Sequence, residues 1–535
     1  MERTFRPLML TAALLACAPL AQAASDSRTL VYCSEASPAG FDPSQYTSGT
    51  EFDASAETVF NRLTQFKRGG TEVEPGLATK WEVSDDGLTY TFHLRPSVKF
   101  HTTDYFRPTR DFNADDVLFT FNRLLNADDP FRKAYPSESP YFTDMGMNTT
   151  IKQVEKVDDQ TVRFHLNNID AAFIQNLAMS FASIQSAEYA AQLLKEGKAG
   201  DINQKPIGTG PFVFKRYQKD AQIRYVGNKD YWKPEDVKLD NLIFSINTDS
   251  ATRLQKLKTG ECQVSGYPRP QDIEEAQKDP NLKVLSQAGF NLGFLAYNVT
   301  HPPLDQLKVR QALDMAIDKP AIIKAVYQGA GQLAQNALPP AQWSYDPNIK
   351  DAPHDPEKAK QLLKEAGVKE GTQINLWAMT VQRASNPNAR MSAQMIQSDW
   401  AKIGIKANIV SYEWGEYIKR AKAGEHDVMI YGWTGDNGDP DNWLGVLYSC
   451  AAVNGSNYAK WCNTGYDKLV THAKLTADRD ERIKLYQQAQ NILKNDVPIT
   501  PIANSKVFQP MRKEVQDFKL SPFGLTPFYG VSLAR

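Results

Sequence analysis

Hydrophobic and polar residues alternate along several stretches of the chain in a strand-like pattern. After a turn-forming Asp-Asp-Gly, the segment LTYTFHL (residues 88–94) alternates apolar with polar side chains, and TVRFHL (161–166) does the same. A period of two residues predicts half-buried strands. The segment VMIYGW (428–433) is apolar almost throughout, which predicts a buried strand.

Other segments carry the spacing of amphipathic helices. DPEKAKQLLKEAG (355–367) opens with Asp-Pro, suited to a helix cap and first turn, and closes with a glycine. Its apolar residues recur at i, i+3, i+4 and i+7, and KVRQALDMAI (308–317) and ERIKLYQQAQNILK (481–494) repeat that pattern. Strand and helix signals alternate without a low-complexity linker, so we predict an α/β fold with more than one lobe.

Composition narrows the possible partners. The chain has 535 residues, of which 41% are hydrophobic and 10% aromatic, as expected for a globular protein of two or three domains. Its formal net charge of −1 argues against nucleic acid or an anionic membrane as the main partner.

The first residues have the pattern of an export signal. A positive start, MERTFR, is followed by the apolar run PLMLTAALLACAPL and by Ala-Gln-Ala at 21–23, which predicts a cleaved signal peptide over residues 1–23. The run is too short to span a membrane, and no later segment approaches the required length of about 20 apolar residues. LLAC, ending at Cys17, weakly resembles a lipoprotein processing site, but Leu15 fits that site poorly. We expect an exported protein that does not itself span the membrane.

Four cysteines remain after removal of the signal: Cys33, Cys262, Cys450 and Cys462. An even number in an oxidising compartment favours disulfides over metal or redox chemistry. Cys450 and Cys462 are close in sequence and form the favoured pair, which leaves Cys33 for Cys262. The sequence alone permits three pairings.

Enzyme and metal motifs are missing from the sequence. The seven histidines are scattered without the HExxH spacing, and neither a GxSxG elbow nor a Walker loop occurs. GAGQLA (329–334) matches a relaxed dinucleotide fingerprint, but it follows a helical pattern where that fingerprint requires a strand. We therefore expect no catalytic residues, no metal site and no cofactor.

One acidic and aromatic stretch, GWTGDNGDPDNW (432–443), requires an explanation. It fails as a calcium loop because the glycine comes too early and the twelfth position lacks a glutamate. Asp439 before Pro440 predicts a helix cap, and Asp441 would then lie in the first helical turn. Asp436 follows a predicted strand, which is the usual ligand position in α/β folds. An Asx turn with Gly438 remains the alternative for Asp436.

Several long motifs, in order, connect the chain to a known family. They are EPGLATKWEVSDDGLTYTFHLRPSVKFH, FNADDVLFTFNRL, PIGTGPF, the Tyr-Trp pair at 231–232, VRQAL, DPEKAKQLLKEAG and GWTGDNGDPDN. Over essentially all of the mature chain, the sequence resembles the periplasmic solute-binding proteins of peptide ABC importers (the peptide/nickel family, family 5), and within them the dipeptide-binding branch. VYCSE, GECQV and the Cys450/Cys462 pair match that branch, which supports both favoured disulfides.

The resemblance implies a two-lobed, hinged binding protein of the Venus-flytrap type, with an extra domain inserted in the first lobe. Lobe one would comprise residues 24–287, with the insertion at about 60–210. Lobe two would comprise residues 288–506, and residues 507–535 would return to lobe one.

The resemblance also implies the ligand site. Asp436 matches the aspartate that holds a peptide's α-ammonium, and Arg383, in VQRASNPNAR, matches the arginine that holds the terminal carboxylate. Trp414 in SYEWGEY matches a tryptophan that lines the peptide pocket. The remaining matches are a first-lobe loop and the segment before Asp436, namely Thr47, Ser48, Gly49, Gly432, Trp433 and Thr434.

One departure from the family pattern concerns the size of the pocket. Ala384 and Ser385 follow Arg383 where close dipeptide binders have Pro-Tyr, and the smaller side chains would admit tripeptides or bulkier side chains. We therefore predict the non-catalytic substrate-binding component of an importer. It would capture dipeptides, and tripeptides as a second cargo, in the periplasm, deliver them to an inner-membrane ABC permease, and act as a monomer. The alternatives are a receptor of the same fold for haem or a metal chelate and, from another class, a secreted peptidase.

Overall fold

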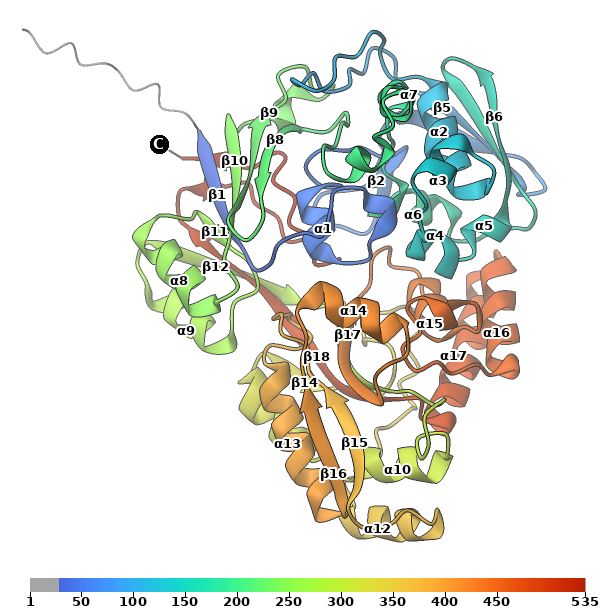
Figure 1. Ribbon diagram of the computed structural model, residues 1–535, viewed down its shortest axis with the longest axis vertical. Helices are drawn as coiled ribbons and strands as arrows, with labels where there is room; N and C mark the ends of the chain where they lie inside the picture. The colour runs from blue at the N-terminus through green and yellow to red at the C-terminus, as the bar shows by residue number, and fades with distance from the viewer. Residues whose placement is uncertain (1–27, 535) are drawn as a thin grey trace, which may run out of the picture.

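The computed structural model describes residues 28–534, so the signal-peptide prediction for residues 1–23 and the question of Cys17 lie outside the described residues. The fold is mixed α/β and has two lobes, stacked one above the other in Figure 1, as expected. We call the upper one lobe one and the lower one lobe two. A 12-stranded sheet runs through both, in the order β16-β15-β17-β13-β18-β11-β1-β10-β9-β8, with β12 and β14 paired to β18.

Lobe one holds the half of this sheet in which β1 is central. Parallel pairing joins β1 to β10 and β11, and antiparallel pairing continues through β9 to β8. Its elements are β1 (Thr29–Ser34), α1 (Gly49–Ala54), β2 (Thr64–Phe66), β3 (Val73–Pro75), β8 (Phe212–Gln218), β9 (Gln222–Gly227), β10 (Asn241–Ile246), α8 (Ser250–Thr259), β11 (Val264–Ser265), α9 (Pro270–Lys278), β12 (Leu282–Ala288), β19 (Val515–Gln516) and β20 (Ser532–Leu533).

A second, four-stranded antiparallel sheet lies beside it, in the order β4-β5-β7-β6. The two alternating segments of the sequence are the neighbouring strands β5 and β7, and in each of them the apolar positions are the buried ones, so both strand predictions are confirmed. The elements of this subdomain are β4 (Ala78–Val83), β5 (Thr89–Leu94), α2 (Ala114–Leu125), α3 (Pro130–Ala134), α4 (Pro140–Asp144), α5 (Met147–Thr150), β6 (Ile151–Asp158), β7 (Thr161–Leu166), α6 (Phe173–Leu177) and α7 (Ala187–Lys195).

Lobe two contains the other half of the long sheet and most of the long helices. Its elements are β13 (Asn291–Tyr297), α10 (Leu307–Met315), α11 (Lys319–Ile322), β14 (Gly331–Leu333), α12 (Pro356–Glu365), β15 (Thr372–Trp377), α13 (Ala389–Lys402), β16 (Ile405–Val410), α14 (Trp414–Lys422), β17 (Val428–Thr434), α15 (Asp441–Tyr448), α16 (Thr464–Leu475) and α17 (Arg479–Asp496).

The predicted helices and the buried strand of lobe two are confirmed as α10, α12, α17 and β17. In α12 the local signals act as expected. The Asp355 side chain accepts the N–H of Lys358 at 2.9 Å, and Gly367 just beyond the helix has a φ of +73°. Leu362 and Leu363 are buried on the apolar face of this helix.

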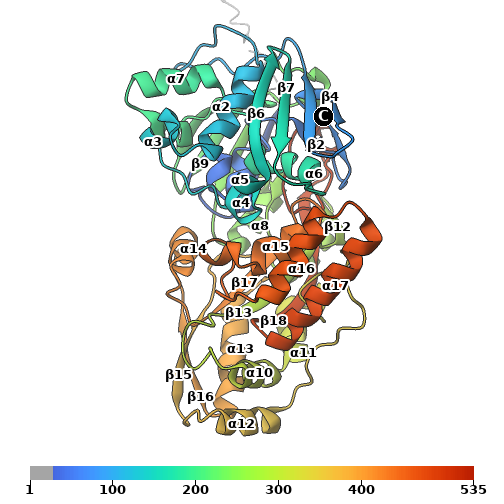
Figure 2. The same cartoon turned by 90° about the vertical axis from the view of Figure 1, so that its right-hand side faces the viewer.

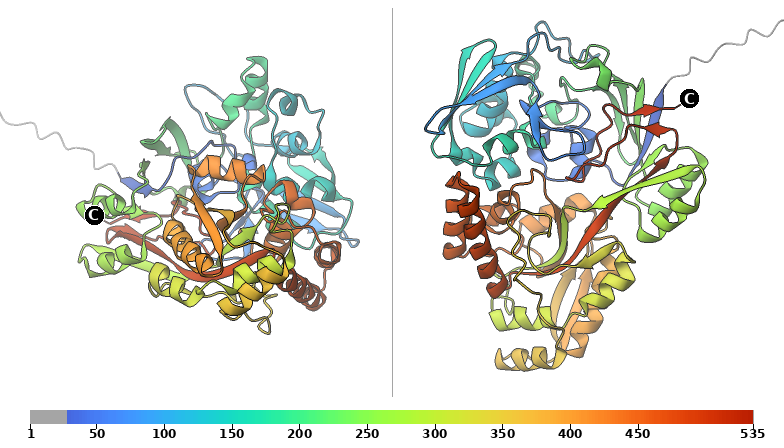
Figure 3. Two further views of the ribbon diagram at one scale, coloured as in Figure 1. Left: turned by 60° about the horizontal axis from the view of Figure 1, so that its bottom comes forward. Right: turned by 180° about the vertical axis from the view of Figure 1, so that it is seen from behind.

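Both lobes share the strand β18 (Ile499–Arg512), which runs between them in Figure 3. It pairs with β13 and β14 in lobe two and with β11 and β12 in lobe one. Where the pairing changes from one lobe to the other, Asn291 braces the crossing. Its side chain donates to the carbonyl of Ser505 and accepts the N–H of Ser505, both at 3.0 Å. The crossing strands connect the two lobes, whereas the exact domain boundaries in the sequence stay predictions.

Two disulfides are present, Cys33–Cys262 and Cys450–Cys462, so the favoured pairing is confirmed. The first ties the end of β1 to the residue two before β11. None of the helices in the described part of the chain is both long and apolar enough to cross a membrane.

Candidate functional site

A cavity of about 630 Å³ lies between the lobes, within the range usual for small-molecule sites. Lobe one contributes the segment around α1 and three tyrosines, Tyr32, Tyr141 and Tyr267. Lobe two contributes the turn after Arg383, the start of α14, and the end of β17 with Asp436 beyond it. Every residue that the sequence analysis assigned to the ligand lines it, namely Thr47, Ser48, Gly49, Arg383, Trp414, Gly432, Trp433, Thr434 and Asp436.

Asp436 lies two residues beyond the carboxyl end of β17. Its backbone N–H donates to the side-chain oxygen of Asn442 at 2.8 Å, and its carboxylate accepts from the Tyr141 hydroxyl and, at 3.4 Å, from the Asn442 amide. Burial raises the pKa of the Asp436 carboxyl from 3.8 to about 7. Within residues 28–534 no basic side chain forms an ion pair with this carboxylate. The alternative Asx turn of Asp436 with Gly438 is wrong, because the Asp436 carboxylate accepts from Tyr141 and Asn442, and the Asx turn lies one residue later, where Asn437 accepts the N–H of Asp439.

The other two aspartates of the motif have local partners. Asp439 forms a bidentate ion pair with Arg482 at 2.8 and 2.9 Å, and it also accepts the N–H of Asp441. The helix begins at Asp441, with Pro440 in the cap position, so the prediction that Asp439 is the cap is off by one residue although its side chain still bonds the first turn. Asp441 pairs with Lys474 at 3.3 Å. Asp436 is therefore the acid of the motif that remains for a ligand.

Arg383 reaches from lobe two toward lobe one. Its Nη1 donates to Glu35 Oε1 and its Nη2 to Thr50 Oγ1, both at 3.1 Å. The guanidinium carbon lies 4.5 Å from the centroid of the Tyr267 ring and 5.5 Å from that of Trp414. Such stacking on aromatic faces favours a cation at this place.

Sequence reasoning missed these lobe-one partners, and Tyr141 as well. For Glu35 a signal existed, because Glu35 directly follows the carboxyl end of β1 much as Asp436 follows that of β17.

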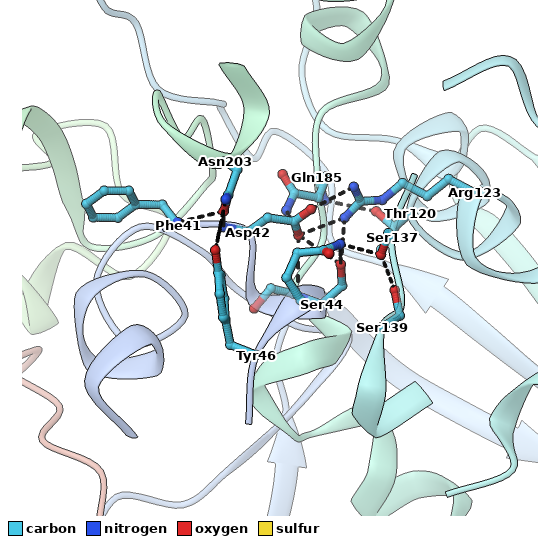
Figure 4. Close-up of polar contacts among 12 residues, drawn as sticks. Phe41, Asp42, Ser44, Tyr46, Thr120, Arg123, Ser137, Ser139, Gln185 and Asn203 are labelled. Atoms are coloured by element: carbon cyan, nitrogen blue, oxygen red, sulfur yellow. Dashed lines mark hydrogen bonds and ion pairs between the residues drawn. The ribbon is translucent and has the colours of Figure 1, made fainter. Parts of the chain in front are cut away.

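The loop Thr47–Gly49 starts helix α1, and the Ser48 hydroxyl accepts the N–H of Thr50. The segment before it is held by a buried network, drawn in Figure 4. There the guanidinium of Arg123, from α2, donates to both carboxylate oxygens of Asp42 at 2.9 Å, and both side chains are almost completely buried. Asn203 Oδ1 accepts the backbone N–H groups of Phe41 and Asp42. The segment that precedes the loop Thr47–Gly49 is therefore held in place, and it fixes the position of this loop at the cavity.

Aromatic rings form the walls near both charged groups. Trp414, the first residue of α14, stacks at 12° against Tyr431 with centroids 6.5 Å apart. Trp433 is buried and packs edge-on against Tyr141 at 5.9 Å, so it belongs to the core as well as to the cavity wall. Ala384, whose small side chain suggested a wide pocket, also lines the cavity.

Comparisons with known proteins agree on one family. A family model described as bacterial extracellular solute-binding proteins, family 5 Middle, matches residues 72–455. The chain is 70% identical over 529 residues to di/tripeptide-binding protein 1 of Pseudomonas aeruginosa, which covers 99% of this chain and 98% of that protein. It is 49% identical over 509 residues to heme-binding protein A of Haemophilus influenzae, with 95% and 93% covered. The fold superposes with a TM-score of 0.92 on a dipeptide-binding protein of Pseudoalteromonas sp. SM9913 in complex with Met-Leu, at 40% identity and with 95% and 100% covered.

Proposed function

This chain belongs to the bacterial extracellular solute-binding proteins of family 5, and we propose that it is the periplasmic receptor of a peptide importer. It captures dipeptides and tripeptides and delivers them to an inner-membrane ABC permease. The observation that carries this proposal is the presence of Asp436 and Arg383 on the walls of one interlobe cavity. The relatives named for di- and tripeptides, and the neighbour that holds Met-Leu, support the same cargo.

A short peptide matches two such groups because it is a zwitterion. The termini of a dipeptide lie about 6–7 Å apart, so an acid and a base fixed at that separation select for its length. Asp436 would hold the ammonium and Arg383 the carboxylate, whose two oxygens suit a planar guanidinium. Both hydrogen-bonded ion pairs strengthen when closure removes water from the cavity.

Closure of the lobes completes both charged sites. Asp436 and Arg383 belong to lobe two, whereas Tyr141 and Glu35, which contact them, belong to lobe one. A ligand that binds first to lobe two therefore gains these surroundings only when the lobes come together. Hinge closure of this kind is a common response to ligands in two-domain proteins.

A second set of contacts between the lobes lies beside the cavity, where α4–α6 stand over α15–α17 in Figures 1 and 2. Asp144 accepts from the N–H and the hydroxyl of Ser456 at 2.9 and 2.8 Å, and Asn437 donates to Asn176 at 2.8 Å. These contacts join the lobes outside the cavity. They therefore stabilise the closed form to the same extent for every peptide, whatever its side chains.

Calorimetric titration with dialanine and two blocked forms tests the proposal. Free dialanine should bind with micromolar or tighter affinity, about −8 kcal/mol or better. Acetylation of its amino end, or amidation of its carboxyl end, should each weaken binding by about 100-fold or more, because Asp436 then lacks its cation or the remaining donors of Arg383 lack a charged acceptor. Equal affinities for all three ligands would reject recognition through the termini. The peptide should remain intact after incubation, and cleavage products would revive the peptidase alternative.

Haem is the second candidate cargo, because one relative carries that name. Native mass spectrometry of protein purified from the producing cells distinguishes the two cargoes by mass. We expect masses of short peptides, and a haem mass at stoichiometric occupancy would favour the alternative.

A further inference from the structure

Part of the guanidinium of Arg383 is already committed to the protein. A guanidinium has five N–H donors. Nη1 donates to Glu35 Oε1 at 3.1 Å and to the carbonyl of Gln382 at 3.0 Å, and Nη2 donates once, to Thr50 Oγ1. Within residues 28–534 no hydrogen bond uses Nε. Two donors therefore remain, the Nε–H and the second N–H of Nη2.

These two remaining donors lie on the same edge of the planar group, because the Nε–H points to the side on which Nη2 stands. They form a two-pronged edge of the kind that binds both oxygens of a carboxylate. The opposite end belongs to lobe one, where Thr50 and Glu35 are themselves joined by a hydrogen bond of 2.7 Å. Arg383 lines the cavity, and its side chain keeps an exposure of 16%.

Glu35 is itself held firmly. Its side chain is only 3% exposed, and it lies two residues after Cys33, which is tied to Cys262. The backbone of Arg383 is also fixed, since its N–H and carbonyl exchange hydrogen bonds with Asn386 at 3.2 and 3.0 Å. The backbone does not fix the orientation of the guanidinium at the end of a long side chain. The Gln382 carbonyl and the Trp414 ring constrain it from lobe two, and Glu35 and Thr50 constrain it from lobe one.

We propose that Glu35 is a positioning residue for peptide carboxylates. From the opposite lobe it holds the Nη1 end of Arg383 and thereby presents the Nε–Nη2 edge to the ligand. The buried ion pair also balances the arginine charge, so selection of a carboxylate depends on two directed hydrogen bonds more than on an unpaired positive charge. This inference rests on the proposed function, because it assumes that Arg383 receives the carboxyl end of a peptide.

The test compares two ligands that differ only at that end, dialanine and alanyl-alaninamide. Both keep the ammonium group. The dissociation constant of alanyl-alaninamide divided by that of dialanine therefore measures the contribution of the carboxylate, and we call this quotient the ratio. In Glu35→Ala we expect this ratio to fall by about tenfold or more, which corresponds to the loss of one well-oriented charged hydrogen bond. In Glu35→Gln we expect a ratio closer to wild type, because the amide oxygen can still accept from Nη1.

Two further variants complete the design. Thr50→Val removes the Nη2 contact and the hydrogen bond from Thr50 to Glu35, but it keeps both charges of the ion pair. It should lower the ratio by a smaller factor, and it serves the purpose if Glu35→Ala does not fold. Glu57→Gln is the matched control, since Glu57 is another buried lobe-one acid, paired with Arg62 at 3.1 Å. It should leave the ratio unchanged.

Other outcomes would overturn the proposal. An equal loss for both ligands in Glu35→Ala would make Glu35 a structural residue only. A higher ratio would make it a competitor of the ligand, and a Glu35→Gln variant no better than Glu35→Ala would exclude positioning through the hydrogen bond. If the wild-type protein does not distinguish the two ligands, the carboxylate site of the proposed function fails, and that result is distinct from a failure of this inference.

Discussion

Replacing Asp436 by asparagine would remove the charge of the proposed ammonium site while keeping its shape. The carboxylate accepts from Tyr141 and Asn442, and the amide oxygen of an asparagine could accept from the same groups. Within the part of the chain that the structure describes, no basic residue is paired with Asp436. The substitution therefore leaves no protein cation without its partner, and its main effect falls on the ligand.

The size of the effect follows from the burial of the site. An ammonium about 4 Å from a carboxylate gains about 4 kcal/mol at the effective dielectric constant of a protein surface. Breaking one partner of a buried pair costs about 2–5 kcal/mol. A loss of about 3 kcal/mol, or about 150-fold in Kd, is the expected result for dialanine.

The pH dependence gives a second, independent signature. Because burial raises the pKa of Asp436 to about 7 when the lobes are in contact, the closed form without ligand carries a proton there at lower pH. Binding an ammonium requires the ionised form, so affinity should fall by up to about tenfold for each pH unit below about 7. In Asp436→Asn this dependence should disappear.

The Asp436→Asn substitution should stabilise the ligand-free protein at high pH, although it weakens peptide binding. The folded pKa of Asp436 lies above its unfolded value of 3.8, so its contribution is fully present below that value and is lost as the pH rises through about 7. At pH 8 the ligand-free Asp436→Asn variant should therefore unfold at a higher temperature than wild type while binding peptide more weakly.

Titration calorimetry between about pH 5.5 and about pH 8, with thermal unfolding in the same buffers, measures all three effects. The control is Asp305→Asn, which removes an exposed acid of lobe two and changes the net charge equally. Binding by Asp436→Asn within about threefold of wild type, or an acid limb that persists in the variant, would refute the assignment.

Three further changes test other parts of the argument. Arg383→Lys keeps the charge but loses the two-pronged edge, so it should weaken dialanine by about tenfold and alanyl-alaninamide by less, as measured by calorimetry. Ser456→Ala removes a hydroxyl from the contact with lobe one and should weaken both ligands by one common factor of about five, whereas a ligand-dependent loss would contradict its role in closure alone. Replacing the Cys33–Cys262 disulfide by serines should cost more stability than replacing Cys450–Cys462, about 5 against about 3 kcal/mol in denaturant unfolding, because it closes the longer loop.

The elements that sequence predicted well are those whose signals are local. Helix α12 has its cap, its first turn, its apolar stripe and its terminating glycine within residues 355–367, and the structure uses each of them. Asp436 could be singled out for the same reason, since Asp439 and Asp441 suggested helix roles within a few residues. The start of α15 is one residue later than predicted, although the Asp439 carboxylate accepts the N–H of Asp441 as well as pairing with Arg482, a distant partner that the local pattern does not contain.

The partners of the charged groups could not be predicted in this way. Tyr141 and Asp436 are 295 residues apart, and Glu35 and Arg383 are 348 apart, so each contact depends on how the lobes meet. Composition and periodicity contain no information on that approach. For the same reason the residues alone could not decide the pairing of Cys33 with Cys262, because these cysteines are brought together by the pairing of the distant strands β1 and β11.

The shared strand β18 has a consequence for the order of events during synthesis. Residues 499–512 lie in the sheet between β13 and β11, so both lobes lack an interior strand until almost the whole polypeptide has been made. Proteins with separate domains usually fold from the amino end while translation continues. This chain cannot fold one lobe at a time in that way, which suits a polypeptide that crosses a membrane before it folds. A version ending at residue 498 should therefore be digested by protease throughout both lobes.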